Sequence, residues 1–531
     1  MPGGVAEWAA VSGNRWVTKL WPKRATGEPG AQDGPTLVVV MAVLDVAPYV
    51  EDAITSVATQ RGVRLTLVVV DDGSTDGTRE LVRKLARRHA NIVYVTQEHA
   101  GLGAARNHGL AQASGDYIAF ADGDDVVPQG AYALMVDSLE ATGSDVCTGA
   151  IRRFDQLREW EPAWSREVHA EQRVGVTLAQ YPWAIKDVLA CNRVIRRAFW
   201  DVEVGEFPEN IIYEDHEPML RTLVHASGID LLSDVVYHWR LRDDGSSTAQ
   251  QKHEISNLRD RLTVKRRAWA MLNEDGVDDV VRTAWLGRVL DVDLPPFVGR
   301  AIEADEHYRA ELGAAAQEYL RLAPPESLPY VRGQQRARMY LAAHGQWDVA
   351  QRLQEEIERD GVRGATVLED GALRLAPALT PGVPDELREM ADYQVRATAR
   401  LRKASRTDGG WELRGVVSLT PLHLGRHRAV AHVWLVVGDD VAAFPGDLSV
   451  RRGRDDESPT LEVAVRLAGG EVPTTAASWP VAVQVDVLGL ARSAALRVPA
   501  EVAAELERIE PQAGDVVVPV VDDGVVALRV V

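Results

Sequence analysis

The stretch Phe120-Ala121-Asp122-Gly123-Asp124-Asp125 places three carboxylates within four residues, directly after the apolar run 117–120. The apolar run is typical of a short buried strand. Like charges this close repel one another, and the cost rises if the site is partly dry. No basic residue near them in the sequence relieves this repulsion. Either the acids bind a divalent cation, because Mg²⁺ and Mn²⁺ prefer carboxylate oxygens, or they form an acidic turn after an edge strand.

The segments around this stretch alternate between strand and helix, which favours the first interpretation. Continuous apolar strands separated by amphipathic helices predict a mostly parallel sheet with both faces covered. The expected strands span 37–41, 65–70, 92–95, 117–120, 144–150, 191–195 and 229–237, and the expected helices 48–60, 78–89, 103–113, 129–140, 196–200 and 214–224. Residues 152–180 read as irregular, as a lid or an acceptor-facing loop would be. Ligands of such sheets bind at the carboxyl ends of strands, where Asp71-Asp72 and the acids at 122–125 fall.

Length and composition limit the class of protein. The 531 residues suggest two to four domains, and the net charge of −19 makes nucleic acid an unlikely partner. The two cysteines cannot form a disulfide framework and suit a reducing compartment. No apolar run is long enough to cross a bilayer, and no secretory leader is evident.

The rest of the chain divides by its hydrophobic period. We expect an N-terminal extension at 1–34, an α/β domain at 35–250, a helical linker at 251–360 and a β-sandwich region at 361–531, which mediates oligomerisation or binds glycans. The extension mixes tryptophans with basic residues, and is either a segment resting on an anionic membrane surface or a loose tail. Asp523-Gly524, between two valine-rich runs, predicts a hairpin.

Two further segments suit a nucleotide. Val69-Val70-Asp71-Asp72-Gly73-Ser74 places two acids in a strand-to-helix turn, where a carboxylate can accept the N3 hydrogen of uracil. Gly101-Leu102-Gly103-Ala104-Ala105-Arg106-Asn107 opens a helix whose N-terminus can receive an anion. Their alternatives are a plain turn and a loop with a surface arginine. Val520-Val521-Asp522-Asp523-Gly524 repeats the letters of the first segment in a turn, so only the strand-turn-helix context is informative.

Two more segments suit catalysis and phosphate binding. Tyr213-Glu214-Asp215-His216 starts a helix, and an acid there serves as a general base if it is partly desolvated, or merely complements the helix dipole. Trp239-Arg240-Leu241-Arg242 precedes a Gly/Ser loop, so its arginines either clamp a diphosphate or form a charged connector.

As an ordered set over about residues 35–250, these segments resemble the inverting family 2 glycosyltransferases of the GT-A fold. The resemblance implies a Rossmann-like mixed sheet, a nucleoside diphosphate sugar as donor, with UDP favoured, and Mn²⁺ or Mg²⁺ as cofactor. It also implies roles for individual residues. These are Ala42 and Leu44 (backbone lining the base), Asp72 (uracil-binding acid), Arg106 (donor contact), Asp122 and Asp124 (the D-x-D pair, with Asp124 as the metal ligand), Asp215 and its neighbour Glu214 (catalytic base), and Arg240, Arg242 and Ser246 (a diphosphate-contacting loop).

Two positions depart from the family pattern. Asn192-Arg193 stands where many relatives have Asn-Lys, a position expected to contact donor or acceptor. Asp45 stands where relatives often have Asn. The whole chain also looks like bacterial wall teichoic acid and capsule-type glycosyltransferases. This wider likeness implies a homotrimer held by the C-terminal region, a polymer or glycan acceptor, and a cytoplasmic location at the inner face of the membrane.

The resulting hypothesis is a metal-dependent single displacement, in which Asp215 takes a proton from an acceptor hydroxyl. Two alternatives stay open. Paired carboxylates also serve glycoside hydrolases, and a degenerate transferase domain would leave a polysaccharide-binding scaffold.

Overall fold

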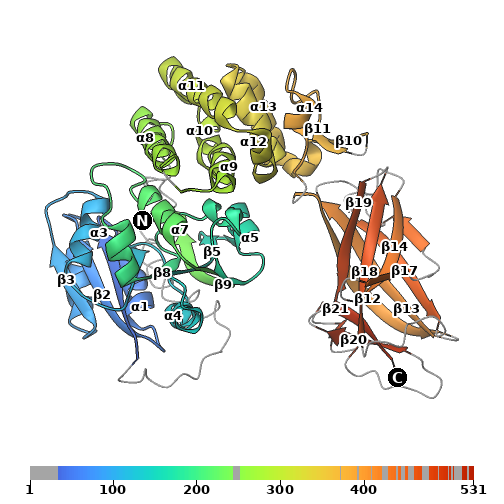
Figure 1. The fold of residues 1–531 in the computed structure, drawn as a ribbon, viewed down its shortest axis with the longest axis horizontal. Helices are drawn as coiled ribbons and strands as arrows, with labels where there is room; N and C mark the ends of the chain where they lie inside the picture. Colours follow the sequence, from blue (N-terminus) through green and yellow to red (C-terminus); the bar gives the residue numbers. More distant parts are fainter. Residues whose placement is uncertain are drawn as a thin grey trace, which may run out of the picture. The chain divides into compact units, whose positions relative to one another are not determined.

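The computed structural model describes residues 34–242, 251–274, 276–370 and most of 372–530. In the last stretch it leaves out residues 392–393, 408–409, 421–428, 438–439, 444–448, 453–459, 469–477, 488–489, 500–501, 504–505, 507–516 and 523–524. The chain divides into two compact units, Met1–Ser247 and Thr248–Val531, and each is described by itself (Figure 1).

The first unit is built on a mixed sheet whose N-terminal half is parallel. Strands β1 (Thr36–Val43), β2 (Arg64–Asp71), β3 (Ile92–Thr96) and β4 (Tyr117–Asp122) lie in the order β3-β2-β1-β4. The apolar residues of β1, β4 and the C-terminal half of β2 are almost entirely buried, as the inner strands of a parallel sheet require, whereas the edge strand β3 is partly exposed. In the register, Val43 of β1 pairs with Asp71, and Ala42 pairs with Asp122. The strand ends that carry the acids are therefore adjacent.

The second half of this sheet mixes parallel and antiparallel strands. Strand β8 (Arg193–Arg196) runs antiparallel to both β4 and β5 (Val146–Phe154), and β9 (Ile229–Arg240) is parallel to β5. Two short strands, β7 (Arg173–Val176) and β6 (Glu159–Trp160), pair with β9 and β5. The prediction of an irregular segment at 152–180 is wrong, because β5 continues to Phe154 and a helix and two strands follow. These elements are too short to give a periodic pattern.

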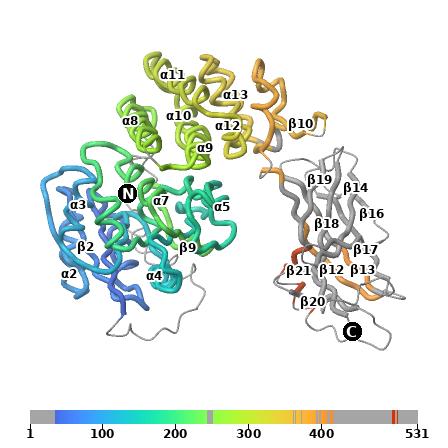
Figure 2. The backbone as a smooth tube through the Cα atoms, viewed as in Figure 1, coloured from blue at the N-terminus to red at the C-terminus, as the bar shows by residue number. Residues whose placement is uncertain are grey.

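Helices cover the sheet, and Figure 2 follows the backbone through them. They are α1 (Val50–Ala58), α2 (Thr78–Ala86), α3 (Leu102–Leu110), α4 (Ala131–Thr142), α5 (Ala163–Val168), η1 (Pro182–Lys186), α6 (Arg197–Phe199), η2 (Trp200–Val204) and α7 (His216–His225). Helix α3 packs very closely on β1, because a Cβ atom at Gly109 would lie 2.4 Å from Val40 Cγ1. This packing holds the N-terminal end of α3 beside the acidic strand ends.

The second unit begins with helices. They are α8 (Ile255–Leu272), α9 (Asp279–Arg288), η4 (Val289–Asp293), α10 (Pro295–Val298), α11 (Glu306–Leu322), η5 (Pro325–Tyr330), α12 (Gly333–Ala343) and α13 (Trp347–Gly364). The predicted helix hairpin is present, and Gly345 makes its turn with a φ of 68°. Strands β10 (Thr366–Glu369) and β11 (Ala372–Leu375) and helix α14 (Asp385–Arg388) follow. No helix in the part of the chain that the structure describes has the length and apolar character to span a bilayer.

The C-terminal part of this unit is made of β-strands, as the period of two predicts. They are β12 (Arg396–Thr407), β13 (Gly410–Thr420), β14 (Ala429–Val437), β15 (Asp440–Ala443), β16 (Ser449–Arg452), β17 (Thr460–Ala468), β18 (Ser478–Val487), β19 (Leu490–Arg497), β20 (Val517–Asp522) and β21 (Val525–Val530). All of their pairings are antiparallel except that of β12 with β19. The hairpin residues Asp523 and Gly524 lie outside the described residues, although β20 and β21 on either side of them pair. The division of the second unit at residue 360 stays a prediction.

Candidate active site

Arginines from distant parts of the chain pair with the acids at the end of β4. Asp122 Oδ1 accepts a hydrogen bond from Arg106 Nη2 at 3.0 Å, and its Oδ2 accepts one from Cys191 Sγ at 3.2 Å. Asp124 Oδ2 accepts a hydrogen bond from Arg242 Nε at 2.6 Å. Both arginines were singled out from the sequence, and the structure brings them to the D-x-D pair.

Asp125, which is not among the expected site residues, holds this region together through buried hydrogen bonds. It is 4% exposed and accepts hydrogen bonds from the Tyr237 hydroxyl at 2.8 Å and from the Arg240 backbone N–H at 2.7 Å. The same hydroxyl accepts the Asp122 backbone N–H at 3.1 Å. Asp125 and Tyr237 therefore fasten the end of β9 to the acidic turn. The sequence marked Asp125 as one of three acids within four residues, but its partner Tyr237 looked like an ordinary strand residue.

Burial and the repulsion of neighbouring carboxylates make Asp124 and Asp125 hard to ionise. Burial raises the pKa of Asp125 well above its ordinary value, and the charges of Asp124 and Asp122 raise it further. Burial also raises the pKa of Asp124, although Arg242 opposes the shift. The site thus contains more negative charge than its arginines compensate.

Arg106 joins the acid pair to the acid at the start of α7. Its Nη1 donates to Glu214 Oε1 at 2.5 Å, and its guanidinium lies 5.3 Å from the centre of the Phe207 ring. Burial raises the pKa of Glu214 to about 7, against the opposing charge of Arg106. Glu214 is buried, whereas Asp215 is partly exposed. Of the two acids, Asp215 is therefore better placed to meet a substrate, and Glu214 holds Arg106.

The backbone before α7 is unusual. Tyr213 has a φ of 70°, in the left-handed region that bulky residues avoid, and Asn210 has a φ of 55°. Strained residues of this kind cluster at functional sites, where the surrounding structure holds them. The strain supports a functional role for the turn that presents Glu214 and Asp215.

The loop that leads into α3 donates hydrogen bonds to the Asp72 carboxylate. Its two oxygens accept hydrogen bonds from the Gln97 side chain and from the backbone N–H groups of Ala100 and Gly101, at 2.8–3.0 Å. His99 Nδ1 lies 2.9 Å from Asp72 Oδ2, and the His99 side chain is 63% exposed. A uracil contact to Asp72 stays a prediction, and it would need one of these partners, most easily exposed His99, to move.

Arg240 is the last residue of β9, and Arg242 follows two residues later. Arg240 Nε donates to the Asp124 carbonyl oxygen at 2.7 Å. The guanidinium groups of Arg240 and Arg242 lie 5.2 and 5.8 Å from the Tyr49 ring centre, so one aromatic ring supports both. Tyr49 had no distinguishing signal in the sequence. Ser246 lies outside the described residues.

Asn192 and Arg193 are enclosed by protein. Arg193 Nη2 donates to Asp187 Oδ1 at 3.0 Å, and Asn192 Nδ2 donates to Asp187 Oδ2 at 2.7 Å. Both residues are 0% exposed, and Asp187 also contacts His169 Nε2 at 3.0 Å. The structure therefore shows them in a buried network, and a contact with donor or acceptor stays a prediction.

The first strand ends near the expected nucleotide site. Ala42 lies in register with Asp122 and Val70, and Leu44 is 38% exposed at the strand's end. Asp45 has a φ of 48°, and its Oδ1 accepts the Thr75 backbone N–H at 2.7 Å. Asn and Asp tolerate this conformation better than other side chains, which explains why an aspartate is accepted here.

The acid cluster, defined as Asp122, Asp124 and Asp125, has a donor set that fits a hard divalent cation. No group of three or more His, Cys, Asp or Glu side chains among the described residues has the arrangement of a metal site. Mg²⁺ is commonly bound through only one or two carboxylates together with substrate phosphates. The partly exposed Asp122 and Asp124 supply such carboxylates. A bound cation would be favoured because it relieves the repulsion between their neighbouring negative charges.

Comparisons with known proteins agree with this geometry. Residues 38–202 match the family model described as Glycosyl transferase family 2. Glycosyltransferase GlyA of Streptococcus pneumoniae is 33% identical over 120 residues, which are 23% of this chain and 17% of that protein. The uncharacterized glycosyltransferase EpsJ of Bacillus subtilis is 31% identical over 215 residues, which are 39% of this chain and 61% of that protein. This chain thus spans less than two thirds of either relative.

The fold also resembles a solved structure over most of its length. The crystal structure of S. aureus TarS matches with a TM-score of 0.54 at 18% identity, covering 93% of this chain and 85% of that one. The match extends beyond the sheet and includes the helical and β regions that the sequence predicts. Residues 38–202, which include the acidic ends of β2 and β4, thus match the Glycosyl transferase family 2 model, and the fold of the chain is similar to that of TarS.

Proposed function

We propose that this chain transfers a sugar from a nucleoside diphosphate sugar to a hydroxyl group with inversion at the anomeric carbon. One observation carries the proposal: Arg106 bridges Asp122 at the end of β4 and Glu214 beside Asp215, which supports a single site for the expected donor and catalytic groups. In the sequence, Arg106 is 16 residues from Asp122 and 108 residues from Glu214. Convergence of this kind is what a reaction centre needs, because its groups must meet one substrate.

The donor would lie over the carboxyl ends of β1, β2 and β4. Asp72 is the candidate for the base, and the arginines at 106, 240 and 242 are candidates for the diphosphate, because guanidinium groups bind phosphate strongly. Asp124, and indirectly Asp122, would hold Mn²⁺ or Mg²⁺, whose positive charge compensates the leaving diphosphate. A UDP-linked sugar is favoured because TarS, which shares the fold, has been solved in complex with UDP-GlcNAc.

Asp215 is the candidate general base. It accepts the proton of the acceptor hydroxyl while the hydroxyl oxygen forms a bond to the anomeric carbon, and the bond to the diphosphate oxygen breaks on the opposite face. One base and one displacement invert the configuration. Positive charge from Arg240 or Arg242 stabilises the departing diphosphate, provided that Arg240 releases the Asp124 carbonyl oxygen or Arg242 releases the Asp124 carboxylate.

The acceptor and the assembly are also matters of proposal. We infer a polymer or glycan acceptor and an oligomer formed through the C-terminal strands, from the family likeness alone. The membrane contact of the N-terminal extension falls on residues 1–33, which lie outside the described part of the chain. The cytoplasmic location stays a prediction.

Nucleotide release tests the proposed activity. The full chain is incubated with UDP-GlcNAc, UDP-glucose, UDP-galactose or GDP-mannose, with Mn²⁺, Mg²⁺ or a chelator, and free nucleoside diphosphate is measured. We expect release from at least one UDP-sugar in the presence of a cation and none with the chelator. Absence of both binding and release for every donor would support the scaffold. Cleavage of simple glycosides without any nucleotide would support the hydrolase.

A further inference from the structure

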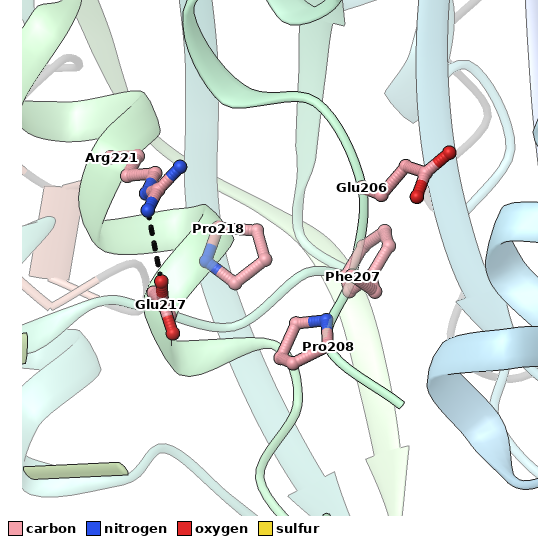
Figure 3. Close-up of a pocket in the computed structure, with 6 residues that line it drawn as sticks. All are labelled: Glu206, Phe207, Pro208, Glu217, Pro218 and Arg221. Carbon is pink, nitrogen blue, oxygen red and sulfur yellow. Dashed lines mark hydrogen bonds and ion pairs between the residues drawn. The ribbon is translucent and has the colours of Figure 1, made fainter. Parts of the chain in front are cut away.

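A cavity lies against α7, the helix that begins next to the candidate base Asp215, and it has no function assigned so far. It has a volume of about 140 Å³ and is lined by Glu206, Phe207, Pro208, Glu217, Pro218 and Arg221. Figure 3 shows Glu217, Pro218 and Arg221 on α7, and the other lining residues on the segment that precedes this helix. An apolar cavity of about 150 Å³ accommodates one benzene ring, so a cavity of this size suits a single six-membered ring or a short polyol.

The cavity wall is continuous with the reaction site. A Cβ atom at Gly103 would lie 2.2 Å from the Pro208 carbonyl oxygen and 3.5 Å from Glu214 Cβ, so α3, the wall and the catalytic turn meet there. The Asn107 side chain fixes the wall through two hydrogen bonds with the Phe207 backbone, at 2.8 and 2.9 Å. The Phe207 ring also supports the Arg106 guanidinium. A group seated in the cavity would therefore lie close to the turn that carries Asp215.

The chemistry of the lining selects a neutral, hydroxyl-bearing occupant. Phe207, Pro208 and Pro218 offer apolar surfaces for the C–H face of a sugar or polyol. Two carboxylates and one guanidinium leave the lining with net negative charge, and Arg221 Nη2 already donates to Glu217 Oε1 at 3.0 Å. Arg221 Nε is buried and has no hydrogen-bond partner among the described residues. A phosphate group would meet repulsion from Glu206 and Glu217.

We propose that this cavity is the acceptor subsite and that it binds the terminal uncharged sugar or polyol unit of the acceptor, and not a phosphate group. The inference rests on the proposed transferase function, because it requires Asp215 to act on a hydroxyl held nearby. It adds that recognition of the acceptor's end is carried by the wall 206–208 and the first turns of α7.

The test compares a pocket-filling variant with a matched control. Glu206→Trp places a large side chain at the exposed edge of the cavity, and Glu209→Trp places one on the same exposed segment outside the lining. Binding of glucose, glycerol, glucose 6-phosphate and glycerol 3-phosphate to the full chain is measured by saturation-transfer NMR. We expect binding of the two neutral probes by the wild type and by Glu209→Trp, weakening on the order of tenfold in Glu206→Trp, and weaker binding of both phosphates.

Two results would overturn the inference. Equal binding of the neutral probes by Glu206→Trp and Glu209→Trp would remove the cavity as their site, and preferential binding of the phosphorylated probes would exclude a neutral occupant. UDP binding by the wild type, measured in parallel, separates this failure from failure of the proposed function. If UDP binds and the probes fail, only the subsite is wrong; if UDP does not bind at all, the transferase proposal falls, and the acceptor assignment falls with it.

Discussion

Two clusters of charged side chains, one in each unit, differ in how their charges are compensated. In the second unit, Asp293 is paired with Lys265 Nζ at 2.7 Å, Arg288 Nη2 at 3.2 Å and Arg261 Nη1 at 3.4 Å; we call this set the Asp293 cluster. Burial would raise the pKa of Asp293, but the three cations lower it to about 2. In the acid cluster, burial and neighbouring carboxylates raise the pKa of Asp124 and Asp125.

The difference teaches how a structural charge network is distinguished from a site that awaits a ligand. In the Asp293 cluster, cationic side chains of the folded chain itself compensate the negative charge of the acid, so Asp293 needs no bound cation. The acid cluster is under-compensated although Arg106 and Arg242 contact it. A cation or a ligand carrying one would remove the remaining repulsion, and this is the physical basis of the proposed site.

The largest expected effect separates catalysis from binding. Replacing the candidate base, Asp215→Asn, should lower sugar transfer by roughly 10³-fold while UDP binding is retained, because general-base catalysis contributes about 10²–10⁴-fold. Glu209→Gln, a change at an exposed acid six residues earlier, serves as the control and should leave transfer unchanged. Transfer at the wild-type rate by Asp215→Asn, with any accepted acceptor, would show that the base is elsewhere.

The next effect concerns stability and compares the clusters directly. Asp293→Asn leaves three buried cations without their acid and should lower the free energy of unfolding by about 3 kcal/mol or more. Asp124→Asn removes one of several repelling acids and should change it by less than about 1 kcal/mol. Chemical unfolding of the full-length variants, followed by fluorescence, measures both. Equal losses would contradict the claim that the two clusters are compensated differently.

The sequence predicts the acid cluster, but it does not predict the Asp293 cluster. The apolar runs that became β1, β2 and β4 have unambiguous patterns, and those of β2 and β4 end at acids, so these strand ends and the positions of Asp72, Asp122 and Asp124 beside them were predictable. The pairing of Asp122 with Arg106 and of Asp124 with Arg242 was not, because it depends on contacts across 16 and 118 residues.

Other features of the structure could not be predicted from the sequence. Tyr237 has the alternation of any strand residue, and its hydroxyl bridge between Asp122 and Asp125 exists only in the folded sheet. Asp293 and Lys265 lie on helical segments where charged residues usually face solvent. Arg193 resembled a substrate contact, yet it is buried against Asp187, because the strand β8 carries it into the sheet.

A smaller effect uses pH to probe the Asp293 cluster. Burial lowers the pKa of Lys265 to about 7, against the attraction of Asp293 and with the repulsion of Arg288 and Arg261; Trp285 also faces it. Between pH 7 and the ordinary lysine value, the unfolded chain binds more protons at this position than the folded chain. The lysine therefore makes the folded state more stable as pH rises through this range.

Lys265→Met removes this dependence. The unfolding free energy of the wild type, relative to Lys265→Met, should rise by about 2 kcal/mol between pH 7 and pH 9. Denaturant titrations at several pH values measure it, with Lys252→Met as a control for general effects of losing a lysine. A relative stability that stays flat or falls over this range would mean that Lys265 is not held as a buried, partly neutral amine.

The most direct test of the central claim is the coupling between nucleotide and cation at the acid cluster. UDP binding to the wild type and to Asp124→Asn is measured by calorimetry with Mn²⁺ and with a chelator. The account predicts that Mn²⁺ strengthens UDP binding to the wild type and that the asparagine variant loses most of this gain. UDP affinity that is the same with and without Mn²⁺, or a gain that survives intact in Asp124→Asn, would contradict it.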